Sequence, residues 1–198
     1  LWGNQPFEIY KEKTGRFMSE FGFQALPDET TLMKMSGKVD SIWDPQWKIH
    51  QKHPTGFETI NTYMEREFNI PEAPYDYAYL SQILQARGLS VAFISHREKE
   101  WCDGSLFWQF NEPWPGINWS AVDYFGKPKA VYYEAKRCFV QQYVYAEEKN
   151  DTVYINLLNS DILKKGELQV SLFSTDGEEL YSEKVFLSFI EKDRVLAK

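Results

Sequence analysis

The chain has 198 residues, of which 43% are hydrophobic and 17% aromatic, enough to bury one sizeable core or two small ones and to exclude intrinsic disorder. Its formal charge of −7 provides no basic surface that could release counterions from a phosphate backbone, which excludes nucleic acid as a partner. Two cysteines are too few for a disulfide scaffold or a metal cluster, and no run of about 18 apolar residues is present that could cross a membrane.

The first predicted element is a short, mostly apolar segment, residues 16–21, which lies between Gly15 and Gly22. This pattern predicts a buried strand that ends at a tight turn, with Glu20 at its carboxyl end. The connection that follows is interrupted too often for a long helix, by Pro27, Gly37, Pro45, Pro54 and Gly56.

Two helices are predicted next. Residues 56–68 carry apolar side chains at helical spacing and end before Pro71. A longer helical pattern begins after Pro74 and ends among the charged residues 97–100, with Gly88 as its weakest position.

A second strand, residues 104–110, and a helix over residues 129–139 complete this part of the chain. The order of strand, long helical crossover, strand and helix is typical of a parallel β/α sheet or barrel. From this order of elements we expect the two strands to be neighbours in the sheet, with their carboxyl ends at the same edge of it.

Apolar and polar residues then alternate with a period of two, which predicts three antiparallel strands over residues 152–158, 167–174 and 180–187. Turn signals separate them at residues 159–161 and 176–177. We therefore divide the chain into residues 1–142 and 143–198, the second part being all-β. Three strands are few for an independent sandwich, and the chain opens without Met, so we expect a piece cut from a longer protein.

Glu20 is the first candidate for chemistry, because the carboxyl ends of barrel strands are where such folds place catalytic groups. Taken alone, a Glu at the end of a strand is more often a surface or ion-paired residue. The residue pattern by itself leaves both interpretations open.

Two blocks of sequence resemble the β-mannosidases of glycoside hydrolase family 2. The segment Arg16-Phe17-Met18-Ser19-Glu20-Phe21-Gly22-Phe23-Gln24 is similar to the nucleophile motif on the seventh barrel strand, with the core Ser-Glu-Phe-Gly-x-Gln. The second block resembles the eighth barrel strand and the segment after it. It consists of residues 104–109 together with Asn111, Trp114, Pro115, Trp119, Ser120, Asp123, Tyr124, Gly126, Lys129, Tyr133 and Lys136-Arg137. The resemblance is close over residues 1–145 and looser beyond.

The resemblance implies an α/β plus all-β fold. Residues 1–142 would be the C-terminal portion of a TIM (β/α)8 barrel, its last two β/α units, and residues 143–198 a partial immunoglobulin-like β-sandwich. It also implies that Glu20 is the catalytic nucleophile and that the acid/base Glu lies on a strand outside this chain. No cofactor and no metal is implied, since two carboxylates are sufficient for the reaction.

Four further residues are candidates for substrate binding. Trp108 matches a family Trp that forms the floor of the sugar site, although it could instead be a barrel-core aromatic, as we expect for Phe107 and Phe110. Gln24 and Asn111 could hydrogen-bond Glu20 or a sugar hydroxyl. Trp114, like the nearby Trp119, could touch substrate at the rim or simply pack.

Glu112 is a decoy, because Asn111-Glu112-Pro113 imitates the Asn-Glu-Pro acid/base motif of related barrels. In those barrels the acid/base precedes the nucleophile in sequence, whereas Glu112 follows Glu20. We therefore expect Glu112 not to be the acid.

The resulting hypothesis is a fragment of a retaining exo-β-mannosidase that hydrolyses terminal β-linked mannose by double displacement and is inactive in isolation. Its partners would be an oligosaccharide or glycoside substrate and the upstream domains of the same polypeptide. Two alternatives remain: another family 2 activity, such as β-galactosidase, β-glucuronidase or exo-β-glucosaminidase, or a non-catalytic carbohydrate-binding module. The compartment stays open among periplasmic or secreted, lysosomal and cytoplasmic locations.

Overall fold

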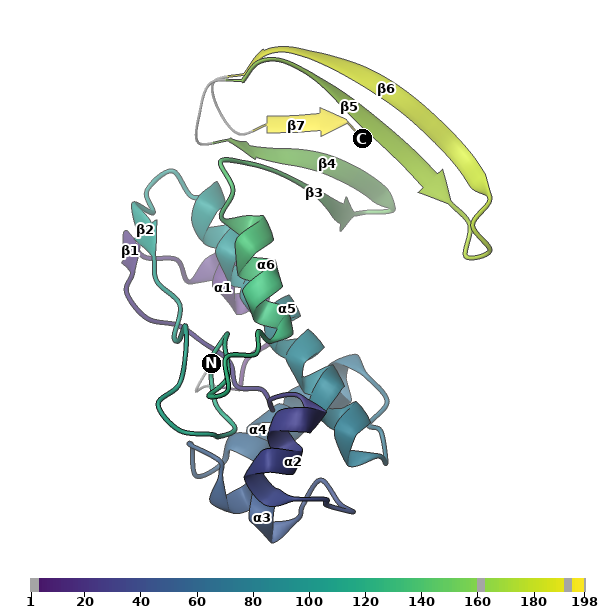
Figure 1. The fold of residues 1–198 in the computed structure, drawn as a ribbon. Helices are drawn as coiled ribbons and strands as arrows, with labels where there is room; N and C mark the ends of the chain where they lie inside the picture. Colours follow the sequence, from purple (N-terminus) through teal and green to yellow (C-terminus); the bar gives the residue numbers. More distant parts are fainter. Residues whose placement is uncertain (1–3, 160–162, 191–193, 198) are drawn as a thin grey trace. The chain divides into compact units, whose positions relative to one another are not determined.

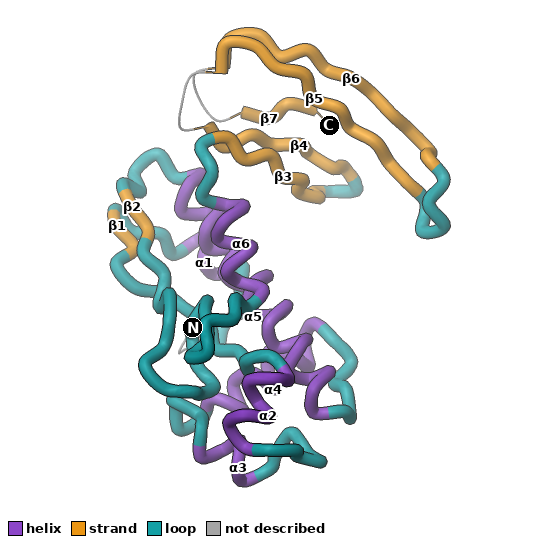
Figure 2. Tube along the Cα trace, viewed as in Figure 1, coloured by secondary structure: helices purple, strands orange, loops and turns teal. Residues whose placement is uncertain are grey.

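The computed structural model describes residues 4–159, 163–190 and 194–197. The chain divides into two compact units, Leu1–Cys138 and Phe139–Lys198. The described part of the first unit consists of helices, loops and one short parallel strand pair, and that of the second consists of antiparallel strands (Figures 1 and 2). The division lies close to the change of pattern that the sequence shows at residue 142. The assignment of the units to a barrel and a sandwich stays a prediction.

The first unit confirms the three longer helices that the sequence predicts, at residues 56–68, from Pro74 to residues 97–100, and at 129–139. Its elements in chain order are α1 (Ile9–Glu12), β1 (Phe17–Met18), α2 (Glu29–Ser36), α3 (Pro45–Ile49), α4 (Gly56–Glu67), α5 (Pro74–Glu98), β2 (Gly104–Ser105) and α6 (Ala130–Cys138). The short helices α2 and α3 were not predicted. Each begins at an aspartate whose carboxylate accepts a backbone N–H of the first turn, Thr31 N in α2 and Gln46 N in α3.

Helix α5 forms the centre of the first unit, because α1, α4 and α6 all pack against it. Gly88 makes one of these contacts possible: a Cβ at this position would lie 2.3 Å from Cε1 of Phe7. The Phe7 ring in turn packs on Phe23 and Tyr63, with ring centroids 5.1 and 4.9 Å away. The glycine that weakened the helical pattern is therefore a packing position.

The two parallel strands are shorter and more exposed than the sequence predicts. In place of strands over residues 16–21 and 104–110, pairing is limited to Phe17–Met18 and Gly104–Ser105, and Phe17 is 54% exposed. A parallel pair becomes buried only when other elements cover both of its faces. Each of these strands has one neighbouring strand in the described structure, so the expectation of a buried strand at residues 16–21 was wrong for this chain.

The buried segment lies after β1 instead, at residues 21–27, where the chain is not part of a strand ladder. Its backbone groups are satisfied by distant partners. Leu26 N donates to Ser81 Oγ at 3.0 Å, Phe23 O accepts from Gln85 Nε2 at 2.7 Å, and Ala25 N donates to Asn118 O at 3.0 Å. Polar side chains of α5 thus hold the backbone that follows Glu20.

The described part of the second unit has five strands where the sequence predicts three. They are β3 (Gln142–Lys149), β4 (Thr152–Asn159), β5 (Leu163–Phe173), β6 (Glu179–Ile190) and β7 (Arg194–Ala197), in the sheet β3–β4–β7 and the hairpin β5–β6 (Figure 1). β3 was missed because Tyr143 and Val144 put apolar side chains on both faces, which obscures the period of two. The predicted turn at 176–177 contains Gly177 with φ of 88°, while the turn at 159–161 falls partly outside the described residues.

Candidate active site

The parallel pairing of β1 and β2 brings the two sequence blocks together. In the register Phe17 lies opposite Gly104 and Met18 opposite Ser105. The contact continues beyond the paired residues, because Trp108 N donates to Phe21 O at 2.7 Å. The carboxyl ends of both strands therefore meet at one edge, with Glu20 just beyond β1 and Trp108 just beyond β2.

Glu20 and Trp108 line the same open cavity, which has a volume of about 470 Å³. Its described lining comprises Tyr10, Met18, Glu20, Phe21, Gly22, Trp108 and Trp119. The side chain of Glu20 is exposed, and it is the one carboxylate among these lining residues. The cavity thus combines a single acidic group with two indole rings.

Gly22 allows the walls of the cavity to approach one another. A Cβ built on Gly22 would lie 2.2 Å from the carbonyl oxygen of Trp108 and 3.0 Å from Cδ1 of Trp119, so any side chain would force these segments apart. The peptide bond between Trp108 and Gln109 is cis. Trp108 remains 46% exposed, and an exposed indole face suits the C–H face of a sugar ring.

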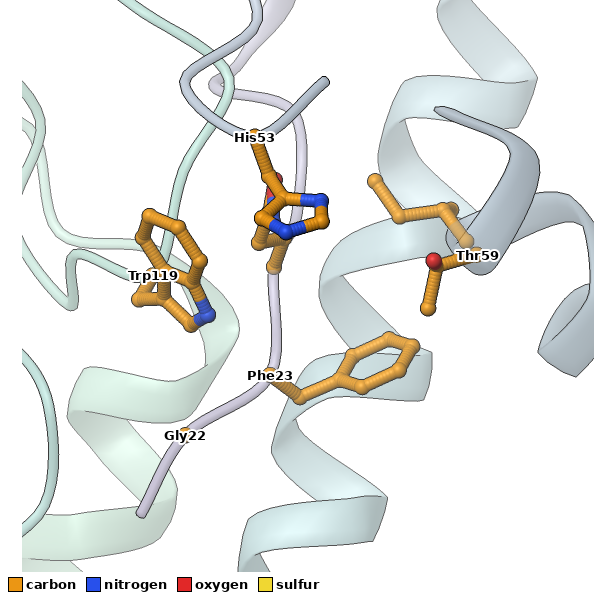
Figure 3. Close-up of a pocket in the computed structure, with 7 residues that line it drawn as sticks. Gly22, Phe23, His53, Thr59 and Trp119 are labelled. Carbon is orange, nitrogen blue, oxygen red and sulfur yellow. The ribbon is translucent and has the colours of Figure 1, made fainter. Parts of the chain in front are cut away.

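A second, smaller pocket of about 20 Å³ shares Gly22 and Trp119 with the cavity. Figure 3 shows Trp119 and His53 on one side of it and Phe23 and Thr59 on the other. Gln24 also lines this pocket and is only 6% exposed. Within the described residues, its Oε1 atom has no hydrogen-bond partner.

Asn111 and Trp114, both expected at the substrate, lie in neither of these spaces. Asn111 is exposed, whereas Trp114 is half-buried, stacks on His50 with ring centroids 5.4 Å apart, and has Lys52 Nζ 4.6 Å from its ring centroid. Their substrate-binding roles stay predictions. Phe110 is 60% exposed, which corrects its expected place in the core.

Glu112 is enclosed in a network of donors, as a structural residue would be. It is 6% exposed, and its carboxylate accepts hydrogen bonds from Asn118 Nδ2, from Ser120 Oγ at 2.8 Å and from Tyr124 N at 2.9 Å. The buried Lys129 adds electrostatic compensation: burial lowers the pKa of Lys129 to about 8, against the opposing effect of nearby Glu112. Both oxygens of Glu112 are therefore occupied by hydrogen bonds within the fold.

Sequence reasoning assigned no site role to four residues that line the cavity, Tyr10, Met18, Phe21 and Gly22. Tyr10 comes from α1 and is 5% exposed; burial raises the pKa of its hydroxyl, and the nearby Tyr63 adds to this effect. The signal that could have found it is the spacing of Phe7 and Tyr10, which is typical of one helical turn with a single apolar face. Trp119, which the sequence left open between rim and packing, lines both the cavity and the pocket.

His96 lies next to this site without lining the cavity. It is 1% exposed, its Nδ1 hydrogen-bonds Ser105 Oγ at 2.8 Å, and its ring meets the ring of Phe21 edge-on with centroids 4.7 Å apart. Burial lowers the pKa of His96 to about 4. The neutral imidazole of His96, on α5, therefore contacts both Ser105 of β2 and Phe21, the residue that follows Glu20.

The described residues contain no group of three or more His, Cys, Asp or Glu side chains that could hold a metal ion. None of the described helices is both long enough and apolar enough to span a bilayer.

No protein-family model matches the chain. Over 141 residues it is 32% identical to β-mannosidase B of Aspergillus niger, and over 155 residues it is 30% identical to the β-mannosidase of Capra hircus. These alignments cover 67% and 71% of this chain but only 16% and 18% of the relatives, so the chain spans about a sixth of their length.

Solved structures match over almost the whole chain. The β-D-mannosidase of Dictyoglomus thermophilum superposes with a TM-score of 0.77 at 30% identity, covering 98% of this chain and 25% of the other. The exo-chitosanase of Amycolatopsis orientalis superposes with a TM-score of 0.75 at 17% identity, a likeness in fold alone.

These matches, together with the mixed helix and strand fold, place the chain among the glycoside hydrolases. Within that class it belongs with the β-mannosidases of glycoside hydrolase family 2, as the motif around Glu20 indicated.

Proposed function

We propose that this chain supplies the nucleophile side of the active site of a retaining exo-β-mannosidase. The observation that carries the proposal is the shared cavity of Glu20 and Trp108 at the carboxyl edge of the β1–β2 pair. In a barrel enzyme this edge is where catalytic groups gather. Under this proposal the first unit corresponds to the last two β/α units of a (β/α)8 barrel, and the second unit to part of a sandwich.

In the proposed mechanism Glu20 attacks the anomeric carbon of a terminal β-linked mannose and forms a covalent glycosyl–enzyme intermediate, which water then hydrolyses. The leaving oxygen needs a proton from a second carboxyl group about 5–5.5 Å from the first. Among the described lining residues Glu20 is the one acid, and Glu112 is committed to its own network. We therefore assign the acid/base to barrel strands of the same polypeptide outside this chain.

Trp108 and Trp119 provide the apolar contact area that a sugar ring requires. Both line the cavity, and Gly22 leaves room for the Trp108 backbone and the Trp119 ring to approach it closely. Rigid indole faces bind the C–H side of a pyranose with little loss of side-chain entropy. The two rings would hold the glycone while Glu20 reacts.

The decisive experiment replaces Glu20 with Gln in the full-length protein that carries this chain. We expect hydrolysis of 4-nitrophenyl β-mannoside to fall on the order of 10³-fold or more with the fold intact, because Gln cannot form the intermediate. A rate close to that of the unchanged protein would remove Glu20 from the mechanism and favour a non-catalytic sugar-binding module.

The substrate assignment needs its own measurement. The unchanged protein is assayed with the 4-nitrophenyl β-glycosides of mannose, galactose, glucuronic acid and glucosamine. We expect the highest kcat/KM on the mannoside. Preference for any of the other three would retain the class of enzyme and overturn the choice of sugar.

A further inference from the structure

The small pocket beside the cavity has a composition that suits a neutral hydroxyl group. Its polar groups are the side chains of Gln24, His53 and Thr59 and the indole N–H of Trp119, and no acidic or lysine side chain is among its described lining residues. The Trp119 ring and Phe23 form apolar walls (Figure 3). Its volume of about 20 Å³ is slightly more than the ~10–15 Å³ that one water-sized group requires, and too small for a sugar ring.

Gln24 supplies this pocket with a hydrogen-bond acceptor, the side-chain oxygen Oε1. The side chain is more than nine-tenths buried, and its Oε1 has no hydrogen-bond partner in the described part of the chain. Buried amide oxygens are almost always paired, because leaving one without a donor costs stability. The position is tightly defined as well: a Cβ built on Gly56, at the start of α4, would lie 2.7 Å from this oxygen.

The pocket and the catalytic cavity lie next to each other, because Gly22 and Trp119 line both. A pyranose resting on the Trp119 ring in the cavity would therefore lie beside the pocket, with a hydroxyl group as its smallest part that could enter. A hydroxyl is both small enough to enter and able to donate a hydrogen bond to Oε1.

We propose that the Gln24 pocket is a hydroxyl subsite, which accepts a hydrogen bond from one specific hydroxyl of the glycone and so selects the sugar. The choice of a glycoside as the ligand rests on the proposed function. A site built to hydrogen-bond a substrate hydroxyl rejects the analogue that lacks it, because the buried partner is then left unpaired.

The test measures binding, so that it does not depend on catalysis. The full-length protein with Glu20→Gln, which prevents turnover, is titrated with methyl β-D-mannopyranoside and its 2-, 3-, 4- and 6-deoxy analogues by tryptophan fluorescence. The same titrations are repeated after Gln24→Met, which keeps the length of the side chain and removes the acceptor.

We expect Gln24→Met to raise the Kd of the parent glycoside about 10-fold. One deoxy analogue should already bind about 10-fold more weakly to the protein with Gln24, and Gln24→Met should weaken that analogue no further, as expected for two groups that interact directly. In crystals of the complex, a sugar oxygen should lie within hydrogen-bond distance of Oε1.

The matched control is Gln82→Met on α5, the same substitution at a side chain outside both spaces, whose Oε1 accepts from Ala130 N at 3.2 Å. It should leave every Kd within about 2-fold, since it removes a single structural hydrogen bond. The proposal fails if Gln24→Met weakens all five glycosides by the same factor or none of them, if no glycoside binds, or if the pocket holds only water in the complex. Full turnover by Glu20→Gln would refute the nucleophile and leave this pattern of binding intact.

Discussion

Two glutamates of this chain differ in how their carboxylates are surrounded. Glu20 is exposed in an open cavity, whereas the oxygens of Glu112 accept hydrogen bonds from Asn118, Ser120 and Tyr124. Replacing Glu112 with Gln turns one accepting carboxylate oxygen into an NH2 group, which would face these hydrogen-bond donors. We expect the free energy of unfolding to fall by about 2–3 kcal/mol, measured by urea denaturation. The kcat of the full-length protein should change less than 10-fold, and a loss as large as that of Glu20→Gln would restore Glu112 as a candidate acid.

His96 makes the stability of the chain depend on pH in a defined window. Its pKa is about 4 in the folded chain and about 6.5 when unfolded, so the unfolded chain takes up a proton first as the pH falls. The stabilising contribution of neutral His96 is therefore complete above pH 6.5 and lost progressively toward pH 4, by about 3 kcal/mol in total.

Replacing His96 with Gln, which does not titrate, isolates this contribution. We expect the difference in unfolding free energy between the two proteins to shrink as the pH falls from 7.5 to 4.5, in urea denaturation at each pH. Parallel pH profiles would show that His96 titrates normally in the folded chain.

At the scale of single elements, Gly88 shows packing that outweighs helix propensity. Alanine is the better helix former by about 1 kcal/mol, yet its Cβ would lie 2.3 Å from the Phe7 ring. We expect Gly88→Ala to destabilise the chain by about 1–3 kcal/mol in thermal unfolding, because Phe7 is itself held by Phe23 and Tyr63. Adding Phe7→Leu should recover part of the loss. An increase in stability from Gly88→Ala alone would contradict this account.

Elements whose structure is determined by residues close in the sequence could be predicted. Segments that depend on partners far away in the sequence could not. Helices α4 and α5 were predicted because apolar spacing and Pro74 are local signals. The path of residues 21–27 depends on hydrogen bonds with Ser81, Gln85 and Asn118, far away in the sequence, so the local pattern did not reveal it and a buried strand was expected at residues 16–21 instead.

The same distinction holds at the candidate site. Glu20 and Trp108 could be placed side by side from the β/α order and the motifs that carry them. Trp114 and Trp119 sit on the same loop, and their sequence context gives no reason to prefer one. Only the tertiary path of the loop puts Trp119 into the cavity and stacks Trp114 on His50.

At the scale of the whole molecule, the proposed mechanism needs two carboxyl groups, of which this chain would supply one. Its cavity is lined by a single acid in the described structure, and the chain spans about a quarter of the solved β-D-mannosidase that it resembles. We expect the 198-residue chain to release mannose from methyl β-D-mannopyranoside no faster than its own Glu20→Gln variant, since the poor alkoxide leaving group needs a proton donor that the described lining residues do not supply. The full-length protein, assayed at the same molar concentration, is the positive control. Turnover by the isolated chain that disappears with Glu20→Gln would mean that the chain brings its own acid, and Glu112→Gln in the isolated chain would then test whether the buried carboxylate of Glu112 is that acid.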